Sequence, residues 1–418
     1  MQFDNLIISL YLLELHPLMT SRFSPIYILS FIAFLTFSCS EKKTSNPTDS
    51  AIENDTFVRI RPSNVKLPKL SDGYKSQKKA IVEKFANKVW RSGNDNISFL
   101  VARNGQIVYE KYEGYANKAE KTDIDSHTPL HIASVSKTLT AAAILKLVDA
   151  DKLELDQKVN TILKTFPYED VTIRMLLNHR SGLRNYAYFT SEKDVWDTKV
   201  TLRNKDILRL LGEKQIALAY PADTHFAYCN TNYAMLALVI EKITGMTYGK
   251  AMQEMIFKPL GMKDTYVFDY DTDKEKASGS YKGNNMRLAY DFLDAIYGDK
   301  NIYSTPRDLL KFDMATYSPD FLKKKLLKQV FKGYSYESKG TKNYGLGFRM
   351  IEWETGQTFF FHNGWWHGNT SSYVTLREEK VTIIALSNKF SRKPYMVRKL
   401  APAFGDYPFE KDKEDLLE

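Results

Sequence analysis

Short apolar runs mark both ends of the chain as strands, and helical repeats fill much of the region between them. Near the start, an apolar run at 97–101 is followed by Asn104-Gly105 and by a second run at 106–109. Asn-Gly between two such runs predicts a β-hairpin. The next strong pattern is a helix that begins near Ser134 and continues to Ala150, with apolar residues at helical spacing.

The middle of the chain, about 155–325, has few alternating segments and is typical of helices and loops. Strand character returns in four β-branched or aromatic runs separated by turn residues, at 345–353, 358–362, 371–376 and 380–387. We therefore predict an α+β fold, an α/β/α sandwich whose antiparallel sheet is built from N- and C-terminal strands and flanked by helices. The middle segment would be an inserted, mostly helical subdomain.

Composition restricts the class of protein. The 418 residues are 43% hydrophobic and 26% charged, which is typical of a globular protein and excludes a disordered chain, a collagen and a polytopic membrane protein. The net charge of +9 comes from basic residues spread along the chain, so we expect no nucleic-acid partner. The two cysteines, Cys39 and Cys229, cannot form a disulfide framework.

Motifs of common cofactor and metal sites are absent from the sequence. It contains no GxGxxG, no Walker A pattern, no HExxH and no CxxC, and it also lacks the GxSxG elbow of α/β-hydrolases. His127 and His131 are four residues apart, but Pro129 between them disfavours the helix that would bring them together. We therefore expect no cofactor and no metal site.

The first 38 residues have the features of a targeting segment. An apolar, uncharged run at 25–38 follows Arg22 and precedes Cys39, a pattern that predicts a lipoprotein signal with acyl chains on Cys39. Met19 starts a more conventional signal than Met1, so translation could begin there. The alternative is a single membrane anchor with Cys39 unmodified. Both interpretations place the remainder outside the cytoplasm, with a lipid-anchored, periplasmic location expected.

Domain limits follow from these patterns. Residues 39–72 are polar and are expected to form a flexible tether, and residues 406–418 form an acidic tail. The globular domain is expected at 73–405. The sequence does not predict the oligomeric state.

The most informative motif is Ser134-x-x-Lys137. A spacing of three on a helix places both side chains on one face, where an uncharged lysine amine can take the serine proton. The spacing alone is weak, because Ser40/Lys43 and similar pairs occur in the tether. Ser134 differs from them because an apolar strand precedes it and a buried helix follows it.

Two further motifs point to the same kind of site. Tyr228-Cys229-Asn230 supplies a phenol for proton transfer and an amide for a substrate carbonyl. His362-Asn363-Gly364 supplies a donor side chain at a strand end and a glycine that allows close approach of a substrate. The alternatives are a helix N-cap with a packed ring for the first motif and an ordinary turn for the second.

The three motifs, in this order, make the chain resemble the serine β-lactamase-like hydrolases of the penicillin-recognising superfamily. The branch it most resembles contains class C β-lactamases, D-Ala-D-Ala carboxypeptidases, D-aminopeptidases and related esterases. The resemblance covers about residues 80–400 and includes supporting segments at 176–183, 259–262, 304–308 and 344–347.

The resemblance implies a role for each motif residue. Ser134 would be the acylated nucleophile, and Lys137 and Tyr228 would share general base and acid duties. The substrate-binding residues would be Asn230, which orients the substrate, together with His362, Gly364, Trp365 and Trp366, which line the cleft. The backbone N–H groups of Ser134 and Trp365 would form the oxyanion hole.

Three functions remain open at this point. The first is an acyl-enzyme hydrolase of a small-molecule or peptide substrate, either a D-amino-acid peptide of the cell wall or a carboxylic ester. The second is a true β-lactamase, which His362 disfavours because lactamases carry a lysine there. The third is a non-catalytic wall sensor, which would not require Ser134, Lys137 and Tyr228 together.

Overall fold

The computed structural model describes residues 65–91, 93–338 and 340–409, all of which belong to one compact unit. The predicted signal segment 1–38, the predicted lipidation site Cys39, the predicted tether up to residue 64 and residues 410–418 lie outside the described residues.

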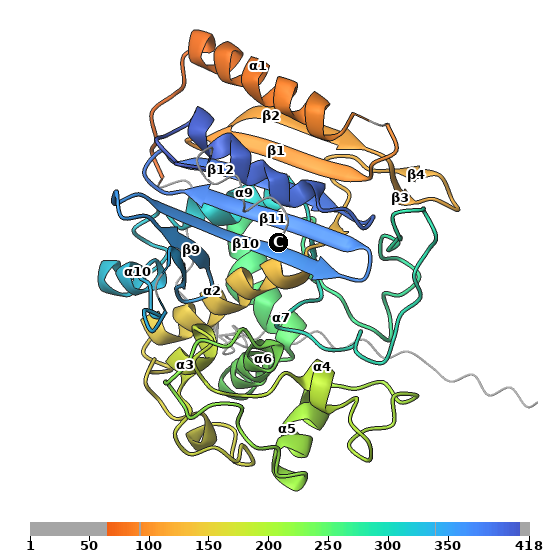
Figure 1. Ribbon diagram of the computed structural model, residues 1–418, viewed down its shortest axis with the longest axis vertical. Helices are drawn as coiled ribbons and strands as arrows, with labels where there is room; N and C mark the ends of the chain where they lie inside the picture. The colour runs from red at the N-terminus through yellow and green to blue at the C-terminus, as the bar shows by residue number, and fades with distance from the viewer. Residues whose placement is uncertain (1–64, 92, 339, 410–418) are drawn as a thin grey trace, which may run out of the picture. The chain divides into compact units, whose positions relative to one another are not determined.

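A seven-stranded antiparallel sheet forms the centre of this unit (Figure 1). Its strand order is β2-β1-β12-β11-β10-β9-β8, so the N-terminal hairpin pairs directly with the last strand of the chain. The bounds are β1 (Ile97–Arg103), β2 (Gln106–Glu113), β8 (Lys342–Tyr344), β9 (Arg349–Glu352), β10 (Thr358–Trp366), β11 (Asn369–Leu376) and β12 (Val381–Ser387).

Both faces of the sheet are buried, which gives three layers. Phe99 and Val101 of β1 belong to an apolar cluster with helix α1 (Asp72–Val89) and the 3-10 segment η5 (Lys393–Ala403). Leu100 and Ala102, which alternate with them, belong to a second cluster on the opposite face. There the sheet packs on α2 (Ser136–Asp149) and α9 (Pro306–Ala315). The predicted α/β/α sandwich is confirmed.

The segment between α2 and α9 forms helices below the sheet in Figure 1. They are α3 (Ile173–Leu177), α4 (Tyr186–Phe189), α5 (Asn204–Glu213), α6 (Asn230–Thr244), α7 (Tyr248–Met252) and α8 (Lys258–Leu260), with a short 3-10 helix η3 (Val159–Thr161) and a short π-helix η4 (Gln253–Phe257). A small sheet also lies in the fold, in the order β5-β7-β6, from β5 (Leu130–His131), β6 (Tyr266–Val267) and β7 (Ile302–Ser304). The remaining elements are β3 (Tyr115–Asn117), β4 (Thr122–Asp123) and α10 (Lys324–Val330).

Two details differ from the sequence-based expectation. The run 345–353 is not one strand, because the chain turns between β8 and β9 and Gly347 there has a φ of 96°. The expected tail also starts too early, because Tyr407 and Phe409 pack in the core around Phe359.

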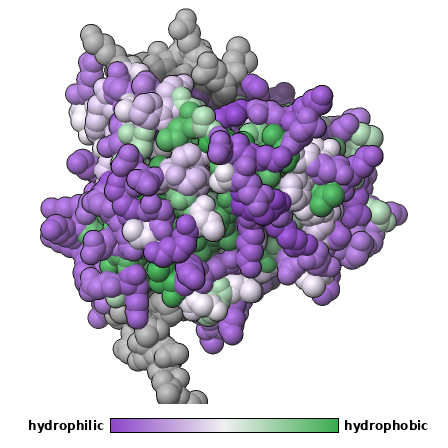
Figure 2. Space-filling view, turned by 90° about the horizontal axis from the view of Figure 1, so that it is seen from below, coloured by the Kyte–Doolittle hydropathy of each residue, from purple (hydrophilic) through white to green (hydrophobic). Residues whose placement is uncertain are grey.

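Within the described residues, no helix has the length and apolar character needed to cross a membrane. The face seen in Figure 2 is mostly hydrophilic, with hydrophobic residues visible between the polar side chains.

Candidate active site

The nucleophile candidate lies in a tight turn between β5 and α2. Ser134 is the middle residue of the 3-10 turn η2 (Ala133–Val135), and α2 itself begins only at Ser136. The residue before it, Ala133, has a φ of 47°, a left-handed conformation that costs a non-glycine residue about 1–2 kcal/mol. The surrounding structure therefore maintains a strained backbone next to Ser134.

Lys137 follows on the first turn of α2 and points back at Ser134. Its amine lies 3.1 Å from Ser134 Oγ and donates a hydrogen bond of 2.8 Å to the backbone carbonyl of Asp299. The side chain is fully buried, and its amine lies 5.1 Å from the centre of the Tyr228 ring and 5.7 Å from that of Tyr233. The predicted meeting of Ser134, Lys137 and Tyr228 is therefore observed.

The Tyr228 loop precedes α6 and is held by a buried histidine. His179 Nδ1 accepts the backbone N–H of Cys229 at 3.2 Å, and its ring centre lies 4.4 Å from that of Tyr228. Among the described residues, the buried Tyr228 hydroxyl and Asn230 Oδ1 have no hydrogen-bond partner. Buried polar atoms without partners are uncommon away from functional sites, so both are suited to contact a substrate.

Strand β10 forms the opposite wall and approaches the nucleophile turn closely. An added Cβ on Gly364 would lie 2.8 Å from Ser134 N and 2.6 Å from the Ile132 carbonyl oxygen. Only glycine permits this approach, which places the Ser134 N–H beside the edge of β10 and the neighbouring Trp365. The glycine was expected to admit a substrate backbone, but this contact shows that it admits the backbone of the nucleophile turn.

His362 differs from the expectation that it lines the cleft. Its side chain is fully buried, with Nε2 3.1 Å from the Tyr344 hydroxyl and Nδ1 2.8 Å from the Asn363 carbonyl. The strand also does not end at His-x-Gly but continues to Trp366. Because its side chain is fully buried and both ring nitrogens have partners within the fold, His362 stabilises the wall and presents no free donor to a substrate.

The two tryptophans after Gly364 occupy different environments. Trp365 is 63% exposed, although its indole N–H donates to the His367 carbonyl, so it offers an ordered apolar surface. Trp366 is half-buried and donates to Asp294.

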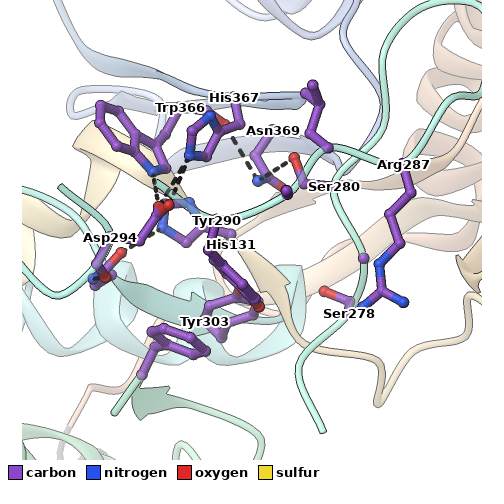
Figure 3. A pocket seen from close by; sticks show the side chains of 15 residues that line it. His131, Ser278, Ser280, Arg287, Tyr290, Asp294, Tyr303, Trp366, His367 and Asn369 are labelled. Atoms are coloured by element: carbon purple, nitrogen blue, oxygen red, sulfur yellow. Dashed lines mark hydrogen bonds and ion pairs between the residues drawn. The ribbon is translucent and has the colours of Figure 1, made fainter. Parts of the chain in front are cut away.

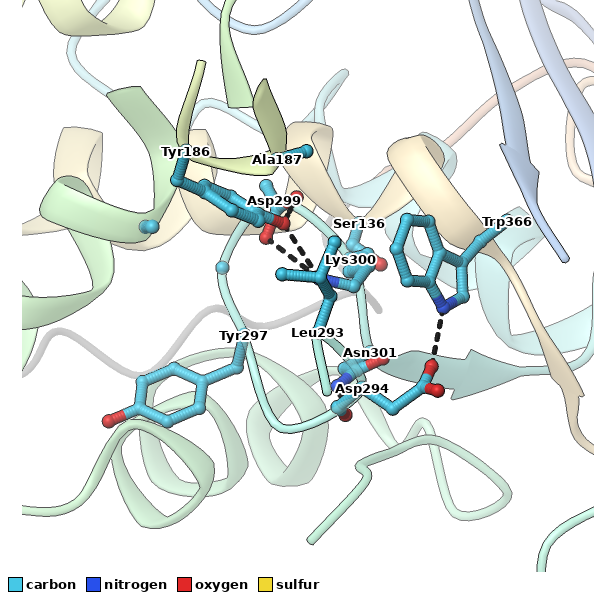
Figure 4. A network of polar contacts seen from close by, with 12 residues as sticks. Ser136, Tyr186, Ala187, Leu293, Asp294, Tyr297, Asp299, Lys300, Asn301 and Trp366 are labelled. Atoms are coloured by element: carbon cyan, nitrogen blue, oxygen red, sulfur yellow. Dashed lines mark hydrogen bonds and ion pairs between the residues drawn. The ribbon is translucent and has the colours of Figure 1, made fainter. Parts of the chain in front are cut away.

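Figure 4 shows that the Trp366 ring lies near the buried Lys300, whose amine is 4.5 Å from the ring centre. Lys300 in turn donates a 2.7 Å hydrogen bond to Tyr186. Trp366 therefore belongs to a packed polar network, and Trp365 is the more available of the two tryptophans for a substrate.

Sequence reasoning missed three residues that contribute to the site. Asp299 and Lys300 lie in the irregular segment between β6 and β7, where no periodicity marks them. Arg349 lies in the run 345–353, which was predicted only as a strand. Its guanidinium carbon lies 4.4 Å from the centre of the Tyr228 ring. Within the described residues the Arg349 side chain has no hydrogen bond or ion pair, so this half-buried cation is available to an anionic group.

Three fully buried histidines surround this site in neutral form. Burial, assisted by Lys137 and Arg349, holds the pKa values of His179 and His362 well below their usual range. Burial also lowers the pKa of His131 to about 4. For each residue the folded pKa is below the unfolded value, so protons bind preferentially to the unfolded chain as the pH falls through the unfolded pKa of about 6.5.

We therefore expect the free energy of unfolding to fall steeply between pH 7 and pH 5. Each of these histidines contributes a loss of roughly 2 kcal/mol over this interval. His367 offsets a small part of the total: burial lowers its pKa, but the hydrogen bond to Asp294 and the negative charges of Asp294 and Asp291 together outweigh burial and raise it. Urea unfolding at the two pH values should show a net loss of about 5 kcal/mol.

A free energy of unfolding that is equal at pH 7 and pH 5 in the unmodified chain would contradict the neutral buried state of these histidines.

Comparisons with known proteins agree with this geometry. The family model described as Beta-lactamase matches residues 81–403. A penicillin-binding protein of Bacillus subtilis (strain 168) is 31% identical over 313 residues, which cover 70% of this chain and 68% of that protein. A D-aminopeptidase of Brucella anthropi is 27% identical over 298 residues, covering 69% of this chain but only 55% of the relative.

A solved structure shows the same fold. The crystal structure of a penicillin-binding protein from Bacillus halodurans superimposes with a TM-score of 0.67 at 24% identity, covering 76% of this chain and 98% of that one. The resemblance expected from the three motifs is confirmed. With a family match over most of its length, the chain belongs to the Beta-lactamase family of serine hydrolases.

Proposed function

We propose that this protein forms an acyl-enzyme on Ser134 and cleaves an amide or ester bond of a small substrate, with cell-wall peptides containing D-amino acids as the favoured class. The observation that carries the proposal is the 3.1 Å distance between the Lys137 amine and Ser134 Oγ, in a buried pocket under the Tyr228 ring. At this distance a proton can pass directly from hydroxyl to amine.

The proposed reaction has two halves. Ser134 Oγ bonds to the substrate carbonyl carbon while Lys137 takes its proton, and the backbone N–H groups of Ser134 and Trp365 bind the oxyanion. The bond to the leaving amine or alcohol then breaks, and Tyr228 and Lys137 return the proton to it. Water attacks the acyl-enzyme in the second half, releasing the acid and restoring the serine.

Arg349 supports a substrate that carries a free carboxylate. It is a cation at the site with no anionic partner among the described residues, and a guanidinium binds a carboxylate through two parallel hydrogen bonds. His362 does not suit this role, because it is fully buried, its Nε2 is hydrogen-bonded to Tyr344, and burial and Arg349 hold its pKa low. A peptide with a free C-terminus therefore fits the site better than an uncharged ester.

We expect Arg349→Gln to lower kcat/KM for a peptide ending in D-Ala-D-Ala by roughly 10- to 100-fold, because a charge-assisted bidentate contact is lost. The same peptide with an amidated C-terminus should lose less than about threefold, and Arg349→Lys should retain part of the activity. An equal loss of kcat/KM for both peptides would show that Arg349 does not bind the C-terminal carboxylate.

A panel of four substrates tests the proposed function itself: the free and amidated peptides, a p-nitrophenyl ester and nitrocefin. Fastest turnover of the free peptide supports the proposal. Fastest turnover of nitrocefin would instead identify a true β-lactamase, and fastest turnover of the ester an esterase. Binding of the peptide without turnover of any member would indicate a non-catalytic sensor.

We further propose that Cys39 carries a lipid that anchors the enzyme on the periplasmic side of a bacterial membrane, on the basis of the apolar segment that precedes it. Cells fed radiolabelled palmitate should label the protein, and Cys39→Ala should abolish the label and release the protein from membranes. Labelling that survives Cys39→Ala would place the lipid elsewhere.

A further inference from the structure

The strained residue before the nucleophile is held by one buried side chain. Ala133 adopts its left-handed backbone with its N–H donating 3.1 Å to His131 Nδ1. His131 is 3% exposed and belongs to strand β5, which pairs with β7 at Tyr303. The hydrogen bond therefore connects the Ala133 backbone to a fixed point of the small sheet.

The hydrogen bonds at the two ring nitrogens define the tautomer of His131. Since Nδ1 accepts the Ala133 N–H, the proton lies on Nε2, which donates to Asn301 Oδ1 at 3.0 Å. The Asn301 side-chain amide donates in turn to the Asp294 carbonyl. Asn301 has a φ of 68°, a conformation that asparagine tolerates better than most residues.

The His131 ring is also fixed by packing. It lies edge-on to Tyr303, with ring centres 5.1 Å apart, in the wall of the pocket shown in Figure 3. Burial keeps the ring neutral and lowers its pKa to about 4, so Nδ1 remains an acceptor at neutral pH. Both the orientation of the ring and its protonation state suit it to hold the Ala133 N–H.

We infer that His131 is a positioning residue for the nucleophile, acting through Ala133. By accepting the Ala133 N–H it holds this residue left-handed, and this conformation aims Ser134 at Lys137. This inference rests on the proposed function, since it concerns the rate at which Ser134 is acylated. His131 itself touches neither Ser134 nor the amine in the contacts of the described residues.

The test places a glycine at position 133, where it can adopt the left-handed backbone without the hydrogen bond to His131. Glycine populates left-handed backbone without the penalty of a Cβ, so Ala133→Gly removes the strain that His131 offsets. We expect His131→Leu to lower the acylation rate constant 10- to 100-fold, since small displacements of a nucleophile reduce rates by this order. In the His131→Leu background, Ala133→Gly should recover about tenfold, and in the unmodified chain its effect should be much smaller.

Acylation is measured by rapid mixing with a chromogenic ester or lactam and normalised to active sites titrated with a fluorophosphonate, so that unfolded protein does not count. Ala150→Gly is the matched control, because Ala150 caps the other end of α2 with an ordinary φ of -88°. It should give no recovery in the His131→Leu background.

Two results would overturn the inference. One is an unchanged acylation rate in His131→Leu, with only the free energy of unfolding reduced. The other is a loss in His131→Leu that Ala133→Gly does not recover. If the unmodified chain fails to acylate with any reagent, the proposed function is at fault rather than this inference.

Discussion

Replacing Lys137 by methionine is expected to lower the acylation rate by about 10²- to 10⁴-fold, the range associated with loss of a general base. Methionine has a similar length and suits the buried, aromatic-walled pocket, so the fold should tolerate it. The Ser134 hydroxyl would then have no amine within 3.1 Å to accept its proton. Stopped-flow acylation with an activated ester measures the effect.

A second buried lysine on the same helix provides the control. Lys146 is 4% exposed and donates 2.8 Å to the Phe321 carbonyl, so Lys146→Met removes a similar buried amine and a similar hydrogen bond far along α2 from Ser134. We expect it to reduce stability but to leave the acylation rate within about threefold. Acylation by Lys137→Met at more than a tenth of the normal rate would exclude Lys137 as the principal base.

The second large effect is expected for Gly364→Ala. The new Cβ would lie 2.4 Å from Ser371 Oγ in addition to its close contacts with Ser134 N and Ile132 O, and two of these three neighbours are backbone atoms. Strand β10 and the nucleophile turn must therefore move apart. We expect kcat/KM to fall at least about 100-fold, because the oxyanion donors and the nucleophile lose their alignment.

Gly73→Ala serves as the comparison for this change. A Cβ on Gly73 meets nothing within 4 Å, and the residue lies in the first turn of α1. Alanine there should leave activity unchanged and slightly favour the helix. Normal kcat/KM in Gly364→Ala would show that the close approach of β10 is not needed for catalysis.

Much of the fold could be predicted because its signals are local. Asn104-Gly105 between apolar runs gave the β1–β2 hairpin, and the Ser134-x-x-Lys137 spacing gave the approach of hydroxyl and amine. The hydroxyl and the amine lie close together even though Ser134 precedes α2 in a 3-10 turn. The turn continues into the helix and keeps both residues on one side.

The features that were missed depend on contacts between distant segments. The carbonyl that holds the Lys137 amine belongs to Asp299, 162 residues away, in a segment without periodicity. The burial of His362 depends on Tyr344 from another strand, and the strained φ of Ala133 depends on the preceding His131 and its link to Asn301. The sequence pattern of one segment does not show which distant residue a side chain contacts. It also does not show the backbone conformation that such a contact stabilises.

The most direct test of the central claim is the position of the covalent adduct. The folded protein is treated with a fluorophosphonate, its intact mass is measured, and the modified residue is located by peptide mapping. We predict a single adduct on Ser134, formed slowly in Lys137→Met and not at all in Ser134→Ala. An adduct on another residue, or labelling that persists in Ser134→Ala, would contradict the assignment of Ser134 as the nucleophile.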